Sequence, residues 1–193
     1  MEEKLKQRPC DLVKVVLFGP ESTGKTTLAE RLSQHYSTVW VEEFMREYLQ
    51  EKWDLHQKVC EPHDLLPIAE GQIQRENQLS GHANRLLICD TDLLELKVYS
   101  EAYYDGFCEP ELLKHALNNH YHVYFLTYID VPWTPDDLRD KPHDREGMFS
   151  RFEKSLQLHN KPYVVLKGDE NERFETAVSV IDQLLKTQER EIQ

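Results

Sequence analysis

Residues 19–26 read Gly-Pro-Glu-Ser-Thr-Gly-Lys-Thr and match the pattern G-x-x-x-x-G-K-[ST] in full. A run of apolar and β-branched residues precedes this segment at 13–18, and helical spacing of apolar residues follows it at 25–36. Glycines allow successive backbone N–H groups to point inward, and the following helix adds the positive end of its dipole. Strand, glycine-rich loop and helix in this order predict a phosphate-binding loop (P-loop) in an α/β fold.

The rest of the chain continues the alternation of strands and helices. Strands are predicted at 13–18, 38–41, 86–89, 123–129 and 163–166. Helices are predicted at 25–36, 43–51, 64–79, 93–102, 110–119, 146–158 and 171–187. This pattern predicts a five-stranded, mostly parallel sheet sandwiched by helices. We expect one domain over residues 1–193, with a core at about 13–187. Ligands of such sheets lie at the carboxyl ends of the strands.

The P-loop predicts ATP and Mg²⁺ as cofactors. Lys25 is expected to reach the β and γ phosphates, and the Thr26 hydroxyl is expected to bind the metal ion. The residues expected to contact ATP are Gly19, Glu21, Ser22, Thr23, Gly24, Lys25, Thr26 and Thr27.

Acidic residues follow the second and third predicted strands. Asp90 ends an apolar strand and is a candidate to hold Mg²⁺ together with Thr26, although aspartate is also a common helix N-cap. Asp92 could bind substrate or cap the helix that begins near residue 93. Glu43 could accept the proton of an acceptor hydroxyl. The alternative for Glu43 is an ordinary helix start, where the helix dipole favours acids.

A polar loop at about 132–150 follows the fourth strand, and its prolines exclude a helix through its first part. Arginines in a loop beside a phosphate site suggest a lid that closes over the transferring phosphoryl group. Arg139 and Arg145 would then spread the charge of the transition state. The alternative is that both are exposed and paired with neighbouring aspartates.

The chain is acidic, with 23 Lys and Arg against 35 Asp and Glu in 193 residues and a net charge of −12. Nucleic acids and anionic membranes attract positive surfaces, so we expect neither as a partner. The expected partner is a small molecule, and the chain is expected to be a monomer or possible homodimer. The N-terminal residues include no apolar run suited to a signal peptide, which favours a cytoplasmic protein.

Four segments together resemble the ribosylnicotinamide kinase domain of the NadR family. They are the P-loop, the segment Glu-Phe-x-Arg-Glu-Tyr at 43–48, the strand end Asp-Thr-Asp at 90–92, and Asp-x-Pro-Trp-x-x-Asp-Asp-x-Arg at 130–139. The resemblance extends over about residues 13–170. It implies a P-loop kinase fold and transfer of the γ-phosphate of ATP to the 5′-hydroxyl of nicotinamide riboside, which gives NMN.

The resemblance also implies roles for single residues. Glu43 and Arg46 match acceptor-site positions, and Arg139 and Arg145 match lid positions. The family commonly has an aromatic residue where this chain has Glu42. The candidates for stacking on the nicotinamide ring are therefore Trp40, Phe44, Tyr48 and Trp133.

NadR proteins carry an adenylyltransferase domain before the kinase, and the residues before position 13 are too few to form one. We therefore expect kinase activity without adenylyl transfer. Two alternatives remain open: a kinase of another nucleoside or small metabolite, and an ATP-binding regulatory module whose output is a protein contact.

Overall fold

Residues 2–134 and 144–192 are described in the computed structural model of the chain. Its strands are β1 (Val13–Phe18), β2 (Trp40–Val41), β3 (Leu86–Asp90), β4 (Val123–Thr127) and β5 (Tyr163–Leu166). They form one sheet in the order β2-β3-β1-β4-β5, and every pairing between neighbours is parallel. The prediction of a five-stranded parallel sheet is confirmed.

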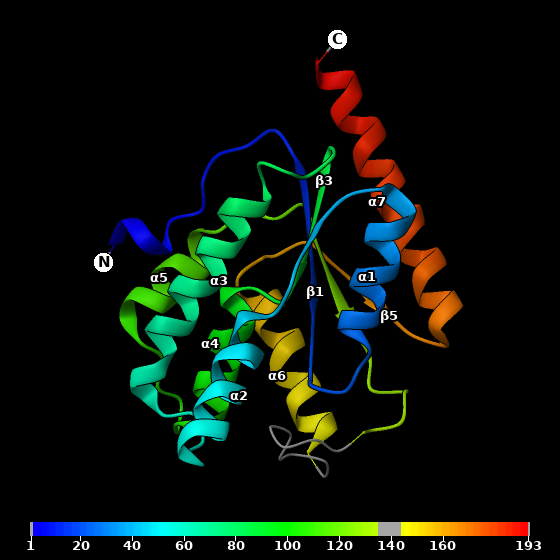
Figure 1. Ribbon diagram of the computed structural model, residues 1–193. Helices are drawn as coiled ribbons and strands as arrows, with labels where there is room; N and C mark the ends of the chain where they lie inside the picture. The colour runs from blue at the N-terminus through cyan, green and yellow to red at the C-terminus, as the bar shows by residue number, and fades with distance from the viewer. Residues whose placement is uncertain (1, 135–143, 193) are drawn as a thin grey trace.

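Helices cover both faces of this sheet, as Figure 1 shows, with α1 and α7 on one face and α3, α4, α5 and α6 on the other. The α-helices are α1 (Lys25–Tyr36), α2 (Phe44–His56), α3 (Leu65–Leu79), α4 (Leu93–Tyr103), α5 (Pro110–Asn118), α6 (Arg145–Leu158) and α7 (Glu170–Ile192). Two short 3-10 helices, η1 (Glu2–Leu5) and η2 (Pro62–Asp64), complete the described elements.

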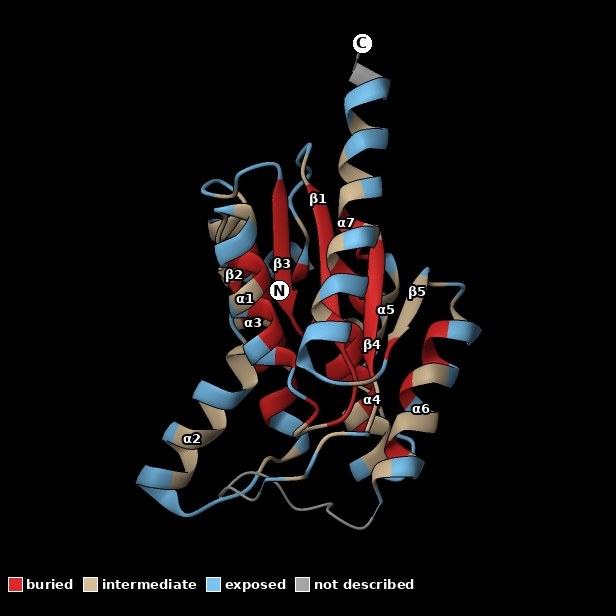
Figure 2. Cartoon of the chain, turned by 90° about the vertical axis from the view of Figure 1, so that its right-hand side faces the viewer, coloured by how far each residue is buried: buried red, intermediate tan, exposed pale blue. Residues whose placement is uncertain are grey.

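The core consists of two layers separated by the sheet. Successive side chains of a strand point to opposite faces, so a central strand must be apolar on both. In β1, Val15 and Leu17 pack against α1 and α7, whereas Val16 and Phe18 pack into the opposite layer. Figure 2 shows β1, β3 and β4 buried along their length. This burial explains why β1 is apolar except for Lys14, which is buried and pairs with Glu76 at 2.9 Å.

Most elements differ from their predicted limits, many of them by a single residue, and β4 ends at Thr127 rather than at the predicted residue 129. The strand predicted at 38–41 begins only at Trp40, because the Thr38 N–H donates to Ser33 O at the end of α1, at 3.0 Å, and is not available to β3. Helix α2 runs five residues past the predicted end at residue 51, to His56. Helix α7 extends to Ile192, beyond the predicted end at residue 187.

Helix α2 packs tightly against α3 at a glycine. A Cβ atom on Gly71 would lie 2.1 Å from Cε1 of Phe44, the first residue of α2. The Phe44 ring therefore leaves no room for a side chain at position 71. We expect Gly71→Ala to destabilise the protein by about 1–3 kcal/mol, despite the higher helix propensity of alanine. Urea unfolding measures the effect. Gly81→Ala is the control, since its Cβ would meet nothing nearer than 3.6 Å, and equal stabilities for the two variants would contradict the prediction.

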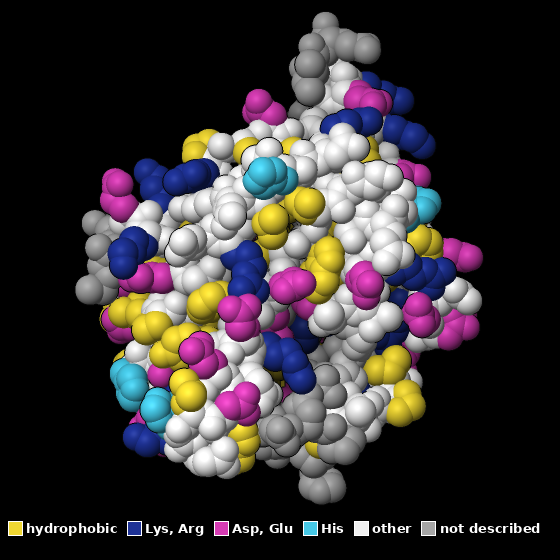
Figure 3. All heavy atoms as spheres, in the orientation of Figure 1, with side chains coloured by type: hydrophobic (Ala, Val, Ile, Leu, Met, Phe, Trp, Pro, Cys, Tyr) yellow, Lys and Arg dark blue, Asp and Glu magenta, His cyan; other side chains and the backbone are white. Residues whose placement is uncertain are grey.

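No helix in the described ranges is both long enough and apolar enough to cross a lipid bilayer. On the face seen in Figure 3, acidic and basic side chains are mixed over the surface. The net negative charge is therefore not gathered into one acidic patch on that face.

Candidate active site

The P-loop connects β1 to α1 at the carboxyl edge of the sheet, at the lower end of β1 in Figure 1. Gly19 has a φ of +136°, and a Cβ atom there would lie 2.8 Å from Oγ1 of Thr127 on β4. Only glycine fits this combination of backbone angle and close approach. The first glycine of the motif therefore allows the loop to lie against β4.

Lys25 is buried and turned back onto its own loop. Its Nζ donates to Gly19 O at 2.7 Å and to Pro20 O at 3.0 Å, and lies 3.2 Å from Oε1 of Glu95. Burial would lower the pKa of Lys25, but the negative charges of Glu95, Glu43 and Asp90 outweigh this effect and raise it. Lys25 therefore places a positive charge beside the P-loop.

Glu95 on α4 is a member of this site that the sequence analysis missed. Its side chain is buried, and Oε2 accepts a hydrogen bond from the Gly19 N–H at 3.2 Å. Burial raises the pKa of Glu95 well above its ordinary value, and Lys25 offsets this only in part. The one signal in the sequence is an acid that interrupts an apolar run at 93–96, just after a strand end.

Thr26 and Asp90 come together as the motifs predict. The Thr26 hydroxyl donates to Oδ2 of Asp90 at 2.5 Å, and Asp90 is buried at the end of β3. Its Oδ1 is also buried and accepts no hydrogen bond from the described part of the chain. Burial raises the pKa of Asp90, with Lys25 and Thr26 opposing the rise. Such a hydroxyl and carboxylate pair has the oxygen donors that Mg²⁺ prefers.

Asp92 serves as the N-cap of α4. One carboxylate oxygen accepts the Glu95 N–H at 3.0 Å, and the other accepts the Tyr124 hydroxyl at 2.9 Å. Asp92 is buried and does not line the main cavity described below. Of the two roles predicted for Asp92, the structure shows capping, and both carboxylate oxygens accept hydrogen bonds inside the protein.

Asp92 gives a testable dependence of stability on pH. Burial raises its pKa from 3.8 to about 6, although the bonds from Glu95 and Tyr124 favour the charged form. Asp92 therefore contributes fully to the free energy of unfolding only when it is protonated, below the pKa it has in the unfolded chain. This contribution is lost as the pH rises through about 6, the pKa of Asp92 in the folded protein. An asparagine at this position would cap equally well without ionising. The stability of Asp92→Asn relative to the parent should rise by about 2 kcal/mol between about pH 4 and about pH 7. Urea unfolding at several pH values measures this difference, and a flat difference would contradict the prediction.

A cavity of about 700 Å³ opens beside the P-loop. Residues 21–27 line its phosphate end, so of the eight predicted ATP contacts only Gly19 lies outside the lining. Helices α2 and α4 form its side walls, and segment 58–60 closes the far end. The cavity therefore leads from the phosphate-binding backbone into a chamber large enough for a nucleoside.

Glu43 and Arg46 both line this cavity. Glu43 stands at the N-cap position of α2, but its carboxylate makes no capping hydrogen bond to the helix. The adjacent Phe44 N–H donates instead to Oε1 of Gln72 on α3, at 2.8 Å, and fixes the start of α2. The Glu43 side chain thus lines the cavity and does not serve as the N-cap of α2.

The aromatic wall of the cavity differs from the predicted one. Its members are Trp53 on α2, Tyr99 and Tyr103 on α4, and Tyr104 just after α4. The four predicted stacking residues do not line the cavity: Trp40, Phe44, Tyr48 and Trp133. Trp40 packs against the layer of α1 and α7, and the Phe44 ring lies against Gly71. Trp53 was missed because the predicted helix ended two residues before it.

An ionic cluster fixes the far end of the cavity. Lys52 Nζ lies 2.6 Å from Oδ2 of Asp64 and 2.9 Å from Oε2 of Glu61, and the Tyr48 hydroxyl donates to Asp64. Burial alone would raise the pKa of Asp64, but its bonds to Lys52, to the Glu61 N–H and to Tyr48 lower it. The acids face the Lys52 ammonium, which ties α2 to η2 and holds segment 58–60 between them.

The predicted lid falls partly outside the described residues, and Arg139 lies in that part. Arg145, at the first turn of α6, donates to Val131 O at 2.8 Å and to Ser22 O at 3.3 Å. The Thr134 N–H donates to Oγ of Ser22 at 2.8 Å. The two hydrogen bonds to Ser22 join residues of the predicted lid segment to the P-loop.

The fold and this site define a P-loop protein with the architecture of the nucleoside kinases. The model of a family described as an AAA domain matches residues 14–173, and the chain belongs to that family. The trifunctional NAD biosynthesis/regulator proteins NadR of Salmonella typhimurium and Escherichia coli are each 24% identical over 177 residues. These matches cover 90% of this chain and 43% of each relative, so the chain spans less than half the length of either.

Solved structures with the same fold include NadR protein in complex with NR, with a TM-score of 0.76 at 22% identity. That match covers 89% of this chain and 51% of the NadR chain. Deoxyadenosine kinase from M. mycoides, with products bound, has a TM-score of 0.67 at 14% identity, and the match covers 88% and 99% of the two chains. The P-loop kinase fold predicted from the sequence is confirmed.

Proposed function

We propose that the chain transfers the γ-phosphate of ATP to the 5′-hydroxyl of nicotinamide riboside and so forms NMN. The observation that carries the proposal is a cavity with the P-loop at one end, Glu43 and Arg46 along its side and an aromatic wall beyond them. The similarity to NadR supports this choice of acceptor, because one NadR structure holds NR, the usual abbreviation of nicotinamide riboside.

Glu43 is the group proposed to act on the acceptor. Its carboxylate orients the 5′-hydroxyl and takes its proton as the hydroxyl oxygen forms a bond to the γ-phosphorus. The bond from that phosphorus to the bridging oxygen breaks, and ADP leaves with the electron pair. Lys25 moves from the carbonyls of its own loop to the phosphates and stabilises their charge.

Thr26 and Asp90 are the residues that would hold Mg²⁺, because the second oxygen of Asp90 is buried beside the P-loop without a hydrogen bond from the described chain. When bound, the ion supplies positive charge that offsets the charge of the phosphates. Arg145 lies against Ser22 O and keeps a second positive group at the phosphate end.

The cavity suits a base that carries a positive charge. The rings of Trp53, Tyr99 and Tyr103 offer negative faces, which attract a cation such as the pyridinium ring of nicotinamide riboside. Glu43, on the same cavity, adds a negative charge. An uncharged nucleoside of equal size would gain only the apolar part of these contacts.

A second candidate is a kinase of another nucleoside. The cavity of about 700 Å³ has room for larger bases, and the deoxyadenosine kinase of M. mycoides shares the fold. ADP formation should therefore be measured with nicotinamide riboside, uridine, cytidine and thiamine as separate acceptors. We expect turnover with nicotinamide riboside to be the fastest. Faster turnover of another acceptor supports the second candidate, and no ADP with any acceptor contradicts the assignment as a nucleoside kinase.

A further inference from the structure

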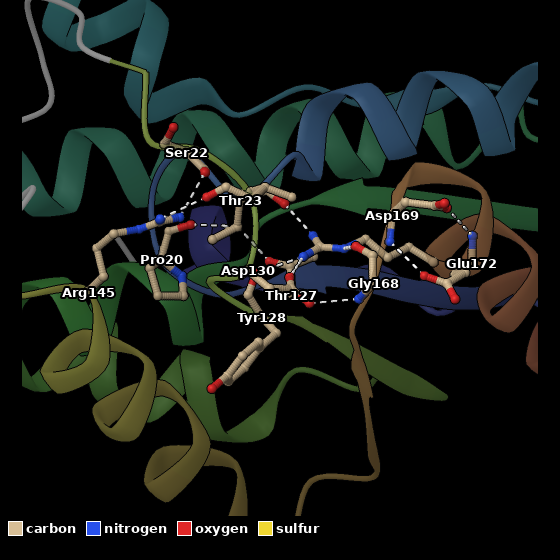
Figure 4. A network of polar contacts seen from close by, with 12 residues as sticks. Pro20, Ser22, Thr23, Thr127, Tyr128, Asp130, Arg145, Gly168, Asp169 and Glu172 are labelled. Atoms are coloured by element: carbon tan, nitrogen blue, oxygen red, sulfur yellow. Dashed lines mark hydrogen bonds and ion pairs between the residues drawn. The ribbon is translucent and has the colours of Figure 1, made fainter.

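Arg173 on α7 is a buried arginine that joins three segments of the nucleotide side of the site. Its side chain is almost fully buried, and its Nε donates to Gly168 O at 3.0 Å. Its Nη1 donates to Thr23 O of the P-loop at 2.7 Å. Its Nη2 donates to Tyr128 O at 2.9 Å and forms an ion pair with Asp130. Figure 4 shows this network between the P-loop, the end of β4 and the turn after β5.

Asp130 balances the buried charge of Arg173. Its Oδ1 pairs with the guanidinium and its Oδ2 accepts the Gly168 N–H at 2.7 Å. Burial would raise the pKa of Asp130, but the Gly168 amide and Arg173 outweigh it and lower that pKa. The charged form of Asp130 is thus favoured, and its carboxylate ties the turn after β5 to the end of β4.

Thr23 is fixed on both its side chain and its carbonyl group. Its hydroxyl donates to Pro20 O at 2.7 Å and lies 2.7 Å from the Thr127 hydroxyl. The C=O and the following N–H of a trans peptide point in opposite directions, and the described chain has no cis peptide. Since Thr23 O points at Arg173, the Gly24 N–H points away from Arg173.

We propose that Arg173 is a positioning residue for phosphate. It holds the Thr23–Gly24 peptide so that the Gly24 N–H is aimed at a phosphate oxygen of the bound nucleotide. It acts through the peptide and does not touch the phosphate itself. The inference rests on the nucleotide-binding half of the proposed function and is independent of the acceptor.

Binding of inorganic tripolyphosphate and of ADP to the whole chain, measured by calorimetry, tests this role. Arg173→Met should weaken the binding of both ligands about tenfold or more. A loss of this size corresponds to one charge-assisted hydrogen bond, here the one from the Gly24 N–H to a phosphate oxygen. Arg31→Met is a matched control, because Arg31 also joins α7, through Asn171 at 2.9 Å and the Phe174 ring at 4.0 Å, but not the P-loop. We expect Arg31→Met to leave both affinities unchanged.

Urea unfolding of each variant separates a role in stability from a role in binding. Unchanged tripolyphosphate affinity in folded Arg173→Met overturns the proposal, and so does an equal loss in Arg31→Met. If Arg173→Met does not fold, Arg173→Lys is the variant that tests the proposal. Lysine keeps the positive charge and can reach Asp130, but it cannot donate to all four groups that accept from Arg173. Weaker tripolyphosphate binding by folded Arg173→Lys supports the proposal, and parent-like binding overturns it. Failure of the parent chain to bind tripolyphosphate would instead contradict the nucleotide site itself.

Discussion

Lys25→Met is expected to lower kcat for ADP formation about a thousandfold, because one preorganised donor at the developing charge contributes that much to catalysis. Methionine matches the length of the lysine stem but has no charge to offer the phosphates. The structure adds a second consequence: Glu95 loses the cation 3.2 Å from its carboxylate and remains buried. We therefore expect Lys25→Met to be less stable as well as inactive.

The two effects separate in a double variant. Lys25→Met with Glu95→Gln removes both buried charges, so stability should recover while activity stays low. Steady-state ADP formation and urea unfolding measure the two properties. Lys4→Met is the control, since Lys4 pairs with Glu70 at the surface and should leave both unchanged. Near-normal kcat in Lys25→Met would contradict the assigned role of the P-loop lysine.

Glu43→Gln is expected to lower kcat about a hundredfold, because glutamine has the size of glutamate but cannot take the proton of the acceptor hydroxyl. The KM for ATP should stay the same, since residues 21–27 are unaltered at the phosphate end of the cavity. Steady-state kinetics with each substrate varied in turn measure this split.

Glu47→Gln is the matched control on the same helix. Glu47 pairs with Arg75 at 2.6 Å and does not line the cavity, so its replacement should leave kcat within about twofold. Equal losses in the two variants would mean that the charge of α2 matters and not the position of Glu43. Full activity in Glu43→Gln would contradict the proposed role of Glu43 in the proton transfer.

The fold was predictable because local and long-range signals agree along most of the chain. Strands β1 and β5 and helix α1 have the predicted limits, since each begins and ends where its apolar spacing does. Helix α2 was predicted too short because the residue that caps its C-terminus, Gln57, adopts a left-handed φ of 52° without being a glycine. Sequence reasoning looks for glycine at such a position.

The site could be predicted only where a sequence motif implies a particular arrangement of its residues in space. The P-loop and the strand-ending Asp90 belong to such motifs, and the structure brings Thr26 and Asp90 together. Glu95 and Arg173 lie inside helices, where charged residues ordinarily face water. Their burial follows from how α4 and α7 pack against the P-loop, which local spacing does not encode.

The sheet order places β1 between β3 and β4, so the P-loop that follows β1 has β3 on one side and β4 on the other. Beyond the P-loop, the cavity is lined mainly by α2, α4 and segment 58–60, whereas the Arg173 network connects the P-loop to β4, the turn after β5, and α7. Substitutions in the chamber leave the residues of that network unchanged. Under the proposed function, the part of the cavity that takes the acceptor can therefore change in sequence while the contacts that hold the P-loop stay the same.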